Sequence, residues 1–323
     1  MQAANASPSS ALPKLLLYLA AVMLGGALLA PVLFDLGQWA KGWLAGHPSG
    51  PGNWLLSEIQ RAHFSRYFNR AVLLCAIVFI IPFLRWVRLD RHLLPTWQPV
   101  GRGVAQWALG FVLAAGLLLA LGFIFLKMGA YQLRPRPDWF KFGEPLTAAL
   151  TAALGAGIVE EFFFRGLLLG LLLRTMSVRG ALLAGTFIFA IVHFMKPPEG
   201  WQIEDAEVTW ASGFLVLRQI AADFGDVDFL LAEFATLFAV GWVLALARMK
   251  TSALWLGIGL HGGWVFGLKY FSALTRSQPG WLPWIGSNLK VGLLPLLVVL
   301  LTGWLALRCL RTNHLQPAPP EGT

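Results

Sequence analysis

Hydrophobic residues occur in long runs along this chain, and polar residues gather between the runs. Most of the runs approach the roughly 20 residues that an α-helix needs to cross a bilayer. Backbone groups in lipid must be hydrogen-bonded within helices, so the pattern predicts an all-α polytopic membrane protein with about eight transmembrane helices. The predicted spans are 15–34, 70–87, 104–127, 146–173, 180–195, 229–247, 251–272 and 289–310.

The composition strengthens this interpretation. Only 13% of the 323 residues are charged and 57% are hydrophobic, whereas a soluble domain carries about 25% charged residues. The chain also holds 15 Trp and 34 Gly, which favour membrane interfaces and membrane helices respectively. We therefore expect one integral-membrane domain over residues 14–312, between a flexible N-terminus at 1–13 and a flexible tail at 313–323.

The net charge of +9 does not indicate nucleic-acid binding. The basic residues lie at the ends of the hydrophobic runs and form no stripe with interleaved aromatic residues, so we expect no nucleic-acid partner. The lipid bilayer, with its anionic headgroups, accounts for the charge more simply. Basic residues are densest in the short even-numbered loops, which predicts that both termini lie in the cytoplasm.

The connection from Lys196 to Asp228 is long, and most of its charged residues are acidic. Within it, residues 208–222 mix apolar residues with few charges, which favours an interfacial or re-entrant helix that covers a cavity. A solvated connector is the alternative. Loops of this length are uncommon and often functional.

Three charges interrupt the run at 146–173: Glu160, Glu161 and Arg165. Ionisable groups at membrane depth are costly and mark functional sites. Arg165 follows Glu161 by four residues, so the two share a helical face and can form an ion pair. Glu160 points about 100° away, which leaves it available as a general base near neutral pH. The alternative is an ion network that only holds helices together.

Small residues indicate close helix packing near these charges. Ala153 and Gly157 share the face of Glu160, and three glycines recur every four residues around His261. Such faces let another helix approach closely. The three glycines are Gly259, Gly263 and Gly267.

Two histidines on other spans are candidate partners for Glu160. His193 follows Phe189 by four residues near the end of its run, where an interfacial residue or a helix cap is the alternative. His261 lies in the middle of its run, where an interhelical hydrogen bond is the alternative. One carboxylate and two imidazoles can deprotonate a water, or hold a metal that does so. We therefore predict Glu160, His193 and His261 as catalytic residues and as candidate metal ligands.

The sequence lacks the motifs of other familiar hydrolases. The chain has no H-E-x-x-H zinc helix and no G-x-S-x-G nucleophile turn. Neither Cys75 nor Cys309 neighbours a candidate histidine in the sequence. Glu233 is a further acid in a span, either beside the site or close to the membrane interface.

Taken in order, Glu160-Glu161-x-x-x-Arg165, Phe189-x-x-x-His193 and His261 in a Gly-rich helix resemble the CPBP intramembrane proteases. This family includes the type II CAAX prenyl endopeptidases and the bacterial Abi proteins. The resemblance covers about residues 146–272. It implies a conical helix bundle around an intramembrane active-site cavity.

By this resemblance, Glu160 activates the water and His193 helps to position it. His261 stabilises the oxyanion or acts as a further ligand, and Arg165 orients and neutralises Glu161. Members are often named metalloproteases, and a metal-free glutamate mechanism is also argued. The cofactor is thus left open between a divalent metal such as zinc and none.

One position departs from the family pattern. Val265 stands where the family usually has Asn, four residues after the histidine of the third motif. Loss of one oxyanion donor can cost about 10²–10³ in rate. Because the other motif residues are intact, we expect a mechanism that needs only Glu160 and the two histidines.

The sequence thus predicts a membrane-embedded endopeptidase of the bacterial inner membrane. Its expected substrate is a protein or peptide with a membrane-proximal or C-terminal segment. Two alternatives stay open. A proton-coupled transporter could use the buried Glu and His as a relay, although we find no internal repeat of the transporter kind. A non-catalytic immunity or assembly factor would account for Val265.

Overall fold

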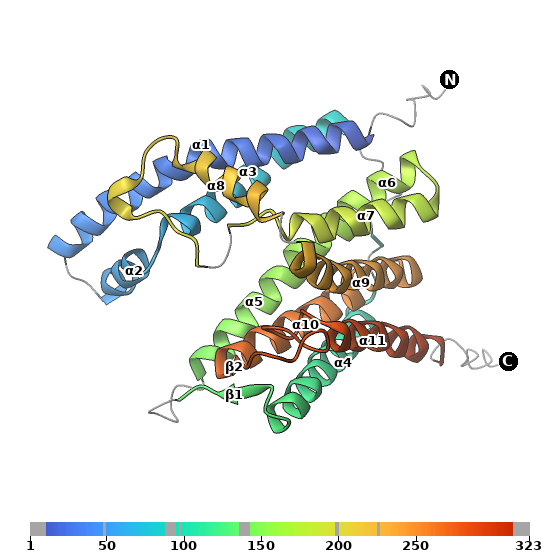
Figure 1. The fold of residues 1–323 in the computed structure, drawn as a ribbon. Coiled ribbons are helices and arrows are strands. Elements are labelled where there is room, and N and C mark those ends of the chain that lie inside the picture. The colour runs from blue at the N-terminus through green and yellow to red at the C-terminus, as the bar shows by residue number, and fades with distance from the viewer. Residues whose placement is uncertain are drawn as a thin grey trace, which may run out of the picture. The chain divides into compact units, whose positions relative to one another are not determined.

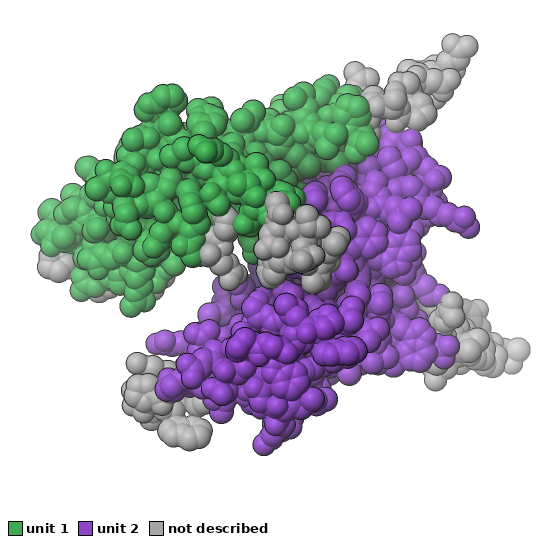
Figure 2. Space-filling model, viewed as in Figure 1, with its two compact units in different colours: residues 1–89, 192–227 green, residues 90–191, 228–323 purple. Residues whose placement is uncertain are grey.

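The computed structural model describes residues 11–47, 50–87, 95–96, 98–135, 143–197, 200–224 and 227–312. These residues are mostly helical, with one small two-stranded sheet (Figure 1). The chain separates into two compact units, which Figure 2 colours differently. Of the predicted flexible ends, residues 1–10 and 313–323 lie outside the described residues, and the first helix begins at Ala11.

Unit 1 comprises residues 1–89 and 192–227. Its helix α1 packs along α3 and also contacts α8. The hydroxyl of Tyr18 on α1 donates to the carbonyl oxygen of Ala76 on α3 at 2.9 Å. The elements of this unit are α1 (Ala11–Gly46), α2 (Gly50–Gln60), α3 (Phe64–Val87), a single 3₁₀ turn (Asp205–Glu207) and α8 (Ser212–Asp223).

Helix α8 occupies most of the stretch predicted as an interfacial helix. Val216 and Ile220, four residues apart, are buried in the core that α1 and α3 form. Gly213 lies directly against the backbone of Ala27, where any larger residue would clash. This packing favours the predicted helix over a solvated connector. Its role in covering a cavity stays a prediction.

Unit 2 comprises residues 90–191 and 228–323. Apart from one terminal residue each of α7 and α9, it holds the remaining elements. These are α4 (Val100–Lys127), β1 (Tyr131–Leu133), α5 (Gly143–Glu161), a π-helix (Phe162–Leu168), α6 (Leu169–Thr175), α7 (Val178–Val192), α9 (Val227–Thr251), α10 (Trp255–Leu274), β2 (Thr275–Ser277) and α11 (Leu293–Thr312). Strands β1 and β2 pair antiparallel and link the ends of α4 and α10.

Helix α10 packs against both α4 and α5. The glycine pattern explains how closely it approaches α4. A Cβ added at Gly263 would lie 2.6 Å from the carbonyl oxygen of Phe111, and Gly259 lies as tightly against Trp107. From the other side, a Cβ added at Gly110 would lie 2.8 Å from the carbonyl oxygen of Leu256. The predicted small-residue face is confirmed, and the backbone contact fixes the helix that carries His261.

The fold is an all-α polytopic membrane protein, as the hydrophobic runs predict. Five helices within the described residues are long and apolar enough to cross a membrane, and α7 is apolar but shorter. The predicted count of eight stays a prediction. Of the other runs, the one at 146–173 is divided by a π-helix that follows α5, and α10 contains His261, Lys269 and several glycines. The five helical segments are Leu12–Gly46, Phe64–Val87, Val100–Lys127, Glu233–Thr251 and Leu293–Leu310.

Candidate active site

The chain is helical from Gly143 to Thr175, in agreement with the long apolar run predicted there. Its middle, however, is a π-helix over Phe162–Leu168. In a π-helix each hydrogen bond spans five residues, and such segments are frequent at functional sites. This one begins directly after Glu161 and contains Arg165. The apolar pattern alone did not predict it.

Arg165 and Glu161 form the predicted ion pair. Arg165 Nη1 donates to Glu161 Oε1 at 2.8 Å, and the two side chains are only 3% and 0% exposed. Arg165 Nη2 also donates to the carbonyl oxygen of Gly241 on α9 at 3.1 Å. The guanidinium carbon lies 4.2 Å from the centre of the Phe189 ring on α7. The buried cation is therefore held by groups from three helical segments, which offsets its loss of hydration.

Glu161 has a second partner that the sequence did not reveal. Its Oε1 lies 3.0 Å from Nδ1 of His261 on α10. An ionised carboxylate only accepts hydrogen bonds, so Nδ1 of His261 is the donor. One carboxylate oxygen thus joins the cation of Arg165 to the imidazole of His261. This arrangement resembles the carboxylate–histidine pairs that orient imidazoles in other sites.

The orientation of His261 turns its other nitrogen toward Glu160. Nε2 of His261 lies 3.7 Å from Oε2 of Glu160. That distance is too long for a direct hydrogen bond, but it leaves both groups within reach of a single water molecule. The imidazole is 5% exposed and the Glu160 side chain 32%. The site therefore has one buried wall, formed by His261, and one more accessible carboxylate.

Close backbone contacts fix α5 against α10 beside this pair. A Cβ added at Gly157 would lie 3.0 Å from the carbonyl oxygen of Ile258, so the helices nearly touch there. A Cβ added at Gly257 would lie 2.8 Å from Glu161 Oε2. Gly257 therefore leaves the space that the carboxylate occupies. The small residues that the sequence placed on the Glu160 face are buried together with Glu161 instead, whereas Glu160 is half-buried.

Phe189 belongs to the same cluster. Its ring meets the His261 imidazole edge-to-face, with 5.8 Å between ring centres and 77° between the planes. It meets Phe164 in the same way at 5.1 Å. The sequence predicted this ring beside His193. His193 follows α7 in the segment that groups with unit 1, so its place beside Glu160 stays a prediction.

The described residues contain no group of three or more His, Cys, Asp or Glu side chains arranged to hold a metal. Within unit 2, the Glu160 carboxylate and Nε2 of His261 face each other as possible metal-ligand atoms. Catalytic zinc usually takes three protein ligands. The predicted metal set therefore depends on His193 as the third ligand.

Two further positions bear on the sequence predictions. Val265 is half-buried and lies on α10 one turn after His261, on the same face of the helix. Its valine side chain offers no hydrogen-bond donor there. Glu233 on α9 pairs with Lys290, in the segment that precedes α11. That pair accounts for the buried acid without a catalytic role.

A comparison with models of known families favours the protease interpretation. Residues 142–267 match the family described as "Type II CAAX prenyl endopeptidase Rce1-like". The chain carries an Rce1-like domain. The predicted family is thus confirmed, over nearly the same residues as the resemblance seen in the sequence. The matched segment contains the Arg165–Glu161–His261 chain, Glu160 and also His193.

The match to the Rce1-like family indicates a broad class of biochemical activity. The family is one of endopeptidases, so it implies a protein substrate and membrane association. No curated protein and no solved structure shows a significant match to the chain.

Proposed function

We propose that this Rce1-like protein is an intramembrane endopeptidase in which Glu160 activates water for hydrolysis of a peptide bond. One observation carries the proposal. Nε2 of His261, oriented by Glu161, faces the carboxylate of Glu160 across 3.7 Å. A water beside this gap can contact both groups. The 32% exposure of the Glu160 side chain favours this role over an ion network that only holds helices together.

The chemistry follows from the hydrogen-bond directions. With Nδ1 of His261 donating to Glu161, a neutral imidazole would carry its lone pair on Nε2, which in this proposal accepts a hydrogen bond from the water. Glu160 takes the other proton of the water as the oxygen attacks the substrate carbonyl carbon. A C–O bond forms, the C–N bond then breaks, and Glu160 returns the proton to the leaving amine.

The remaining residues have supporting roles in this proposal. Arg165 neutralises Glu161 and fixes its position, and Phe189 packs against both Arg165 and His261. His193 is proposed to complete the site by positioning the water. If a divalent ion such as zinc is bound, Glu160, His193 and His261 are its proposed ligands, and the ion would lower the proton affinity of the water.

The proposed substrate is a protein or peptide with a membrane-proximal or C-terminal segment. We propose the bacterial inner membrane as the location, with both termini in the cytoplasm. On that topology His193 lies near the outer end of its span, so we propose that the cavity opens toward the periplasmic side. A prenylated CAAX substrate would instead require access from the cytoplasm.

The test is cleavage in proteoliposomes that contain the full-length protein and a panel of tagged membrane substrates. The wild type should release a fragment that the Glu160→Gln variant does not. Glu144→Gln is the matched control, because Glu144 is an exposed glutamate at the start of the same helix. Equal cleavage by the wild type and the Glu160→Gln variant would refute the assignment of Glu160.

A further inference from the structure

Helices α9 and α11 touch closely at one point along their length. A Cβ added at Gly303 on α11 would lie 2.6 Å from the side chain of Val243 on α9. Two cavities lie along these helices, one on each side of the contact between Gly303 and Val243. Both belong to unit 2, and neither includes a residue of the candidate active site.

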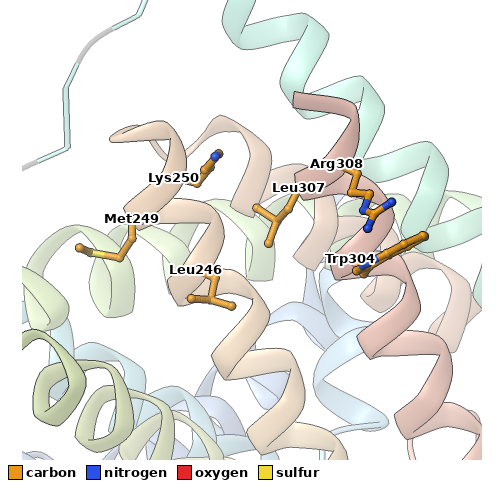
Figure 3. A pocket seen from close by; sticks show the side chains of 6 residues that line it. All are labelled: Leu246, Met249, Lys250, Trp304, Leu307 and Arg308. Atoms are coloured by element: carbon orange, nitrogen blue, oxygen red, sulfur yellow. The ribbon is translucent and has the colours of Figure 1, made fainter. Parts of the chain in front are cut away.

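The first cavity has a volume of about 460 Å³ and a cationic rim (Figure 3). Lys250 and Arg308 supply the charges from two different helices. The Arg308 guanidinium carbon lies 4.4 Å from the centre of the Trp304 ring, which holds it beside the cavity. The walls are otherwise apolar: Leu246, Met249 and Leu307.

The second cavity has a volume of about 540 Å³ and only apolar side chains around it. It lies nearer the N-terminal ends of α9 and α11, and α7 closes one side of it. Its walls are Leu183, Phe234, Ala235, Phe238, Ala239, Trp242, Leu296 and Leu300.

Helical spacing places both cavities along one groove. On each helix the lining residues recur every four positions, so they lie on one continuous face. The residue numbers rise together on both helices, so α9 and α11 run in the same direction. From Phe238 to Lys250 the groove extends about 18 Å, at 1.5 Å per residue. The two series are Phe238, Trp242, Leu246 and Lys250 on α9, and Leu296, Leu300, Trp304 and Arg308 on α11.

The groove is therefore apolar along most of its length and has two cationic side chains at one end. Its length is close to the roughly 15 Å of hydrocarbon in one leaflet of a bilayer. Lys250 and Arg308 lie at the last turns of two candidate membrane spans, and Trp304 lies one turn deeper. Cations at helix C-termini also interact favourably with the helix dipole, but that role requires no apolar groove beneath them.

We propose that this groove binds an anionic phospholipid of the surrounding bilayer. The phosphate group lies between Lys250 and Arg308, and one acyl chain follows the apolar face of α9 and α11. Basic pockets between membrane helices bind anionic headgroups in this way. A bound lipid would join α9, whose Gly241 carbonyl contacts Arg165, to α11. The proposal does not depend on the proposed protease activity.

The test measures lipid binding to the purified full-length protein. The delipidated protein is titrated with phosphatidylglycerol and, separately, with phosphatidylcholine of the same acyl chains, and bound lipid is counted by native mass spectrometry. The wild type should bind phosphatidylglycerol more tightly. The double variant Lys250→Gln/Arg308→Gln should weaken that binding about 30-fold, which corresponds to about 1 kcal/mol for each cation.

The matched control removes the same number of charges from two other helices. Lys127 and Lys269 are exposed at the C-terminal parts of α4 and α10, so Lys127→Gln/Lys269→Gln should leave phosphatidylglycerol affinity unchanged. Equal loss in both double variants, or no preference in the wild type, would overturn the site. Inorganic phosphate should not displace the lipid, because it cannot fill the apolar groove. Displacement by phosphate alone would overturn the lipid as the occupant.

Discussion

Nδ1 of His261 and Nη1 of Arg165 donate to the same carboxylate oxygen, Oε1 of Glu161, at 3.0 and 2.8 Å. His261 and Glu161 are separated by 100 residues in sequence and carried by different helices. Glu161 thus does two things at once. It neutralises a fully buried guanidinium, and it fixes the orientation of the imidazole that faces Glu160. The proposed mechanism thus divides positioning and catalysis between two adjacent glutamates.

Replacement of Glu161 should therefore damage stability and activity together. The Glu161→Gln variant leaves the Arg165 cation buried without an opposite charge, which typically costs about 3–5 kcal/mol when a buried pair is broken. It also removes the acceptor charge that orients His261. Thermal unfolding in detergent should show a large decrease in stability, and cleavage should fall as well.

Glu160→Gln provides the contrast. The Glu160 side chain is 32% exposed. We therefore expect the free energy of unfolding of this variant to lie within about 1 kcal/mol of the wild-type value, as for most substitutions outside the core. Cleavage should nevertheless fall by about 10²–10⁴, the usual contribution of a general base. If Glu160→Gln destabilises the fold as much as Glu161→Gln, the two residues share one structural role.

The space beside Glu161 should be essential as well. In a Gly257→Ala variant, the new methyl group would lie 2.8 Å from Glu161 Oε2. The carboxylate or α10 must shift, at a cost of about 1–3 kcal/mol. Because Glu161 orients His261, we expect kcat to fall more than KM rises. Gly116→Ala on the exposed side of α4 is the control, since nothing lies within 4 Å of its added Cβ.

Arg165 should not tolerate lysine, although the charge is kept. A lysine ammonium cannot reproduce the planar fork that donates to Glu161 and to Gly241 while lying over Phe189. Loss of one hydrogen bond from a charged group costs about 1.5–3 kcal/mol. The free energy of unfolding of Arg165→Lys should be lower than that of the wild type by that amount. Arg179→Lys, at an exposed arginine at the start of α7, is the control and should be neutral.

Much of this site could be predicted from local sequence, because its first contacts are local. Glu161 and Arg165 are four residues apart, and that spacing alone predicted their ion pair. The three glycines around His261 likewise predicted a tightly packed helix, since a helix without side chains on one face must lie against another backbone. Order and spacing of the motifs were enough to indicate the Rce1-like family.

The contacts between distant segments could not be predicted in the same way. Nothing in the spacing of Glu161 and His261 indicates that they meet, because that depends on how α5 packs against α10. The π-helix after Glu161 also has no signal in the apolar periodicity. The count of spans is hard to predict for a related reason: a π-helix divides the apolar run at 146–173, and α7 has only 15 residues.

Val265 offers the sharpest test of how many groups the reaction needs. An asparagine at this position, one turn after His261, would offer an amide donor that valine lacks. If Glu160 and the histidines suffice, Val265→Asn should change kcat by less than about tenfold, well below the 10²–10³ effect of a true oxyanion donor. Val265→Thr, which is close in volume, controls for polarity alone. A gain of 10² or more in Val265→Asn only would mean that the native site lacks a donor the reaction can use.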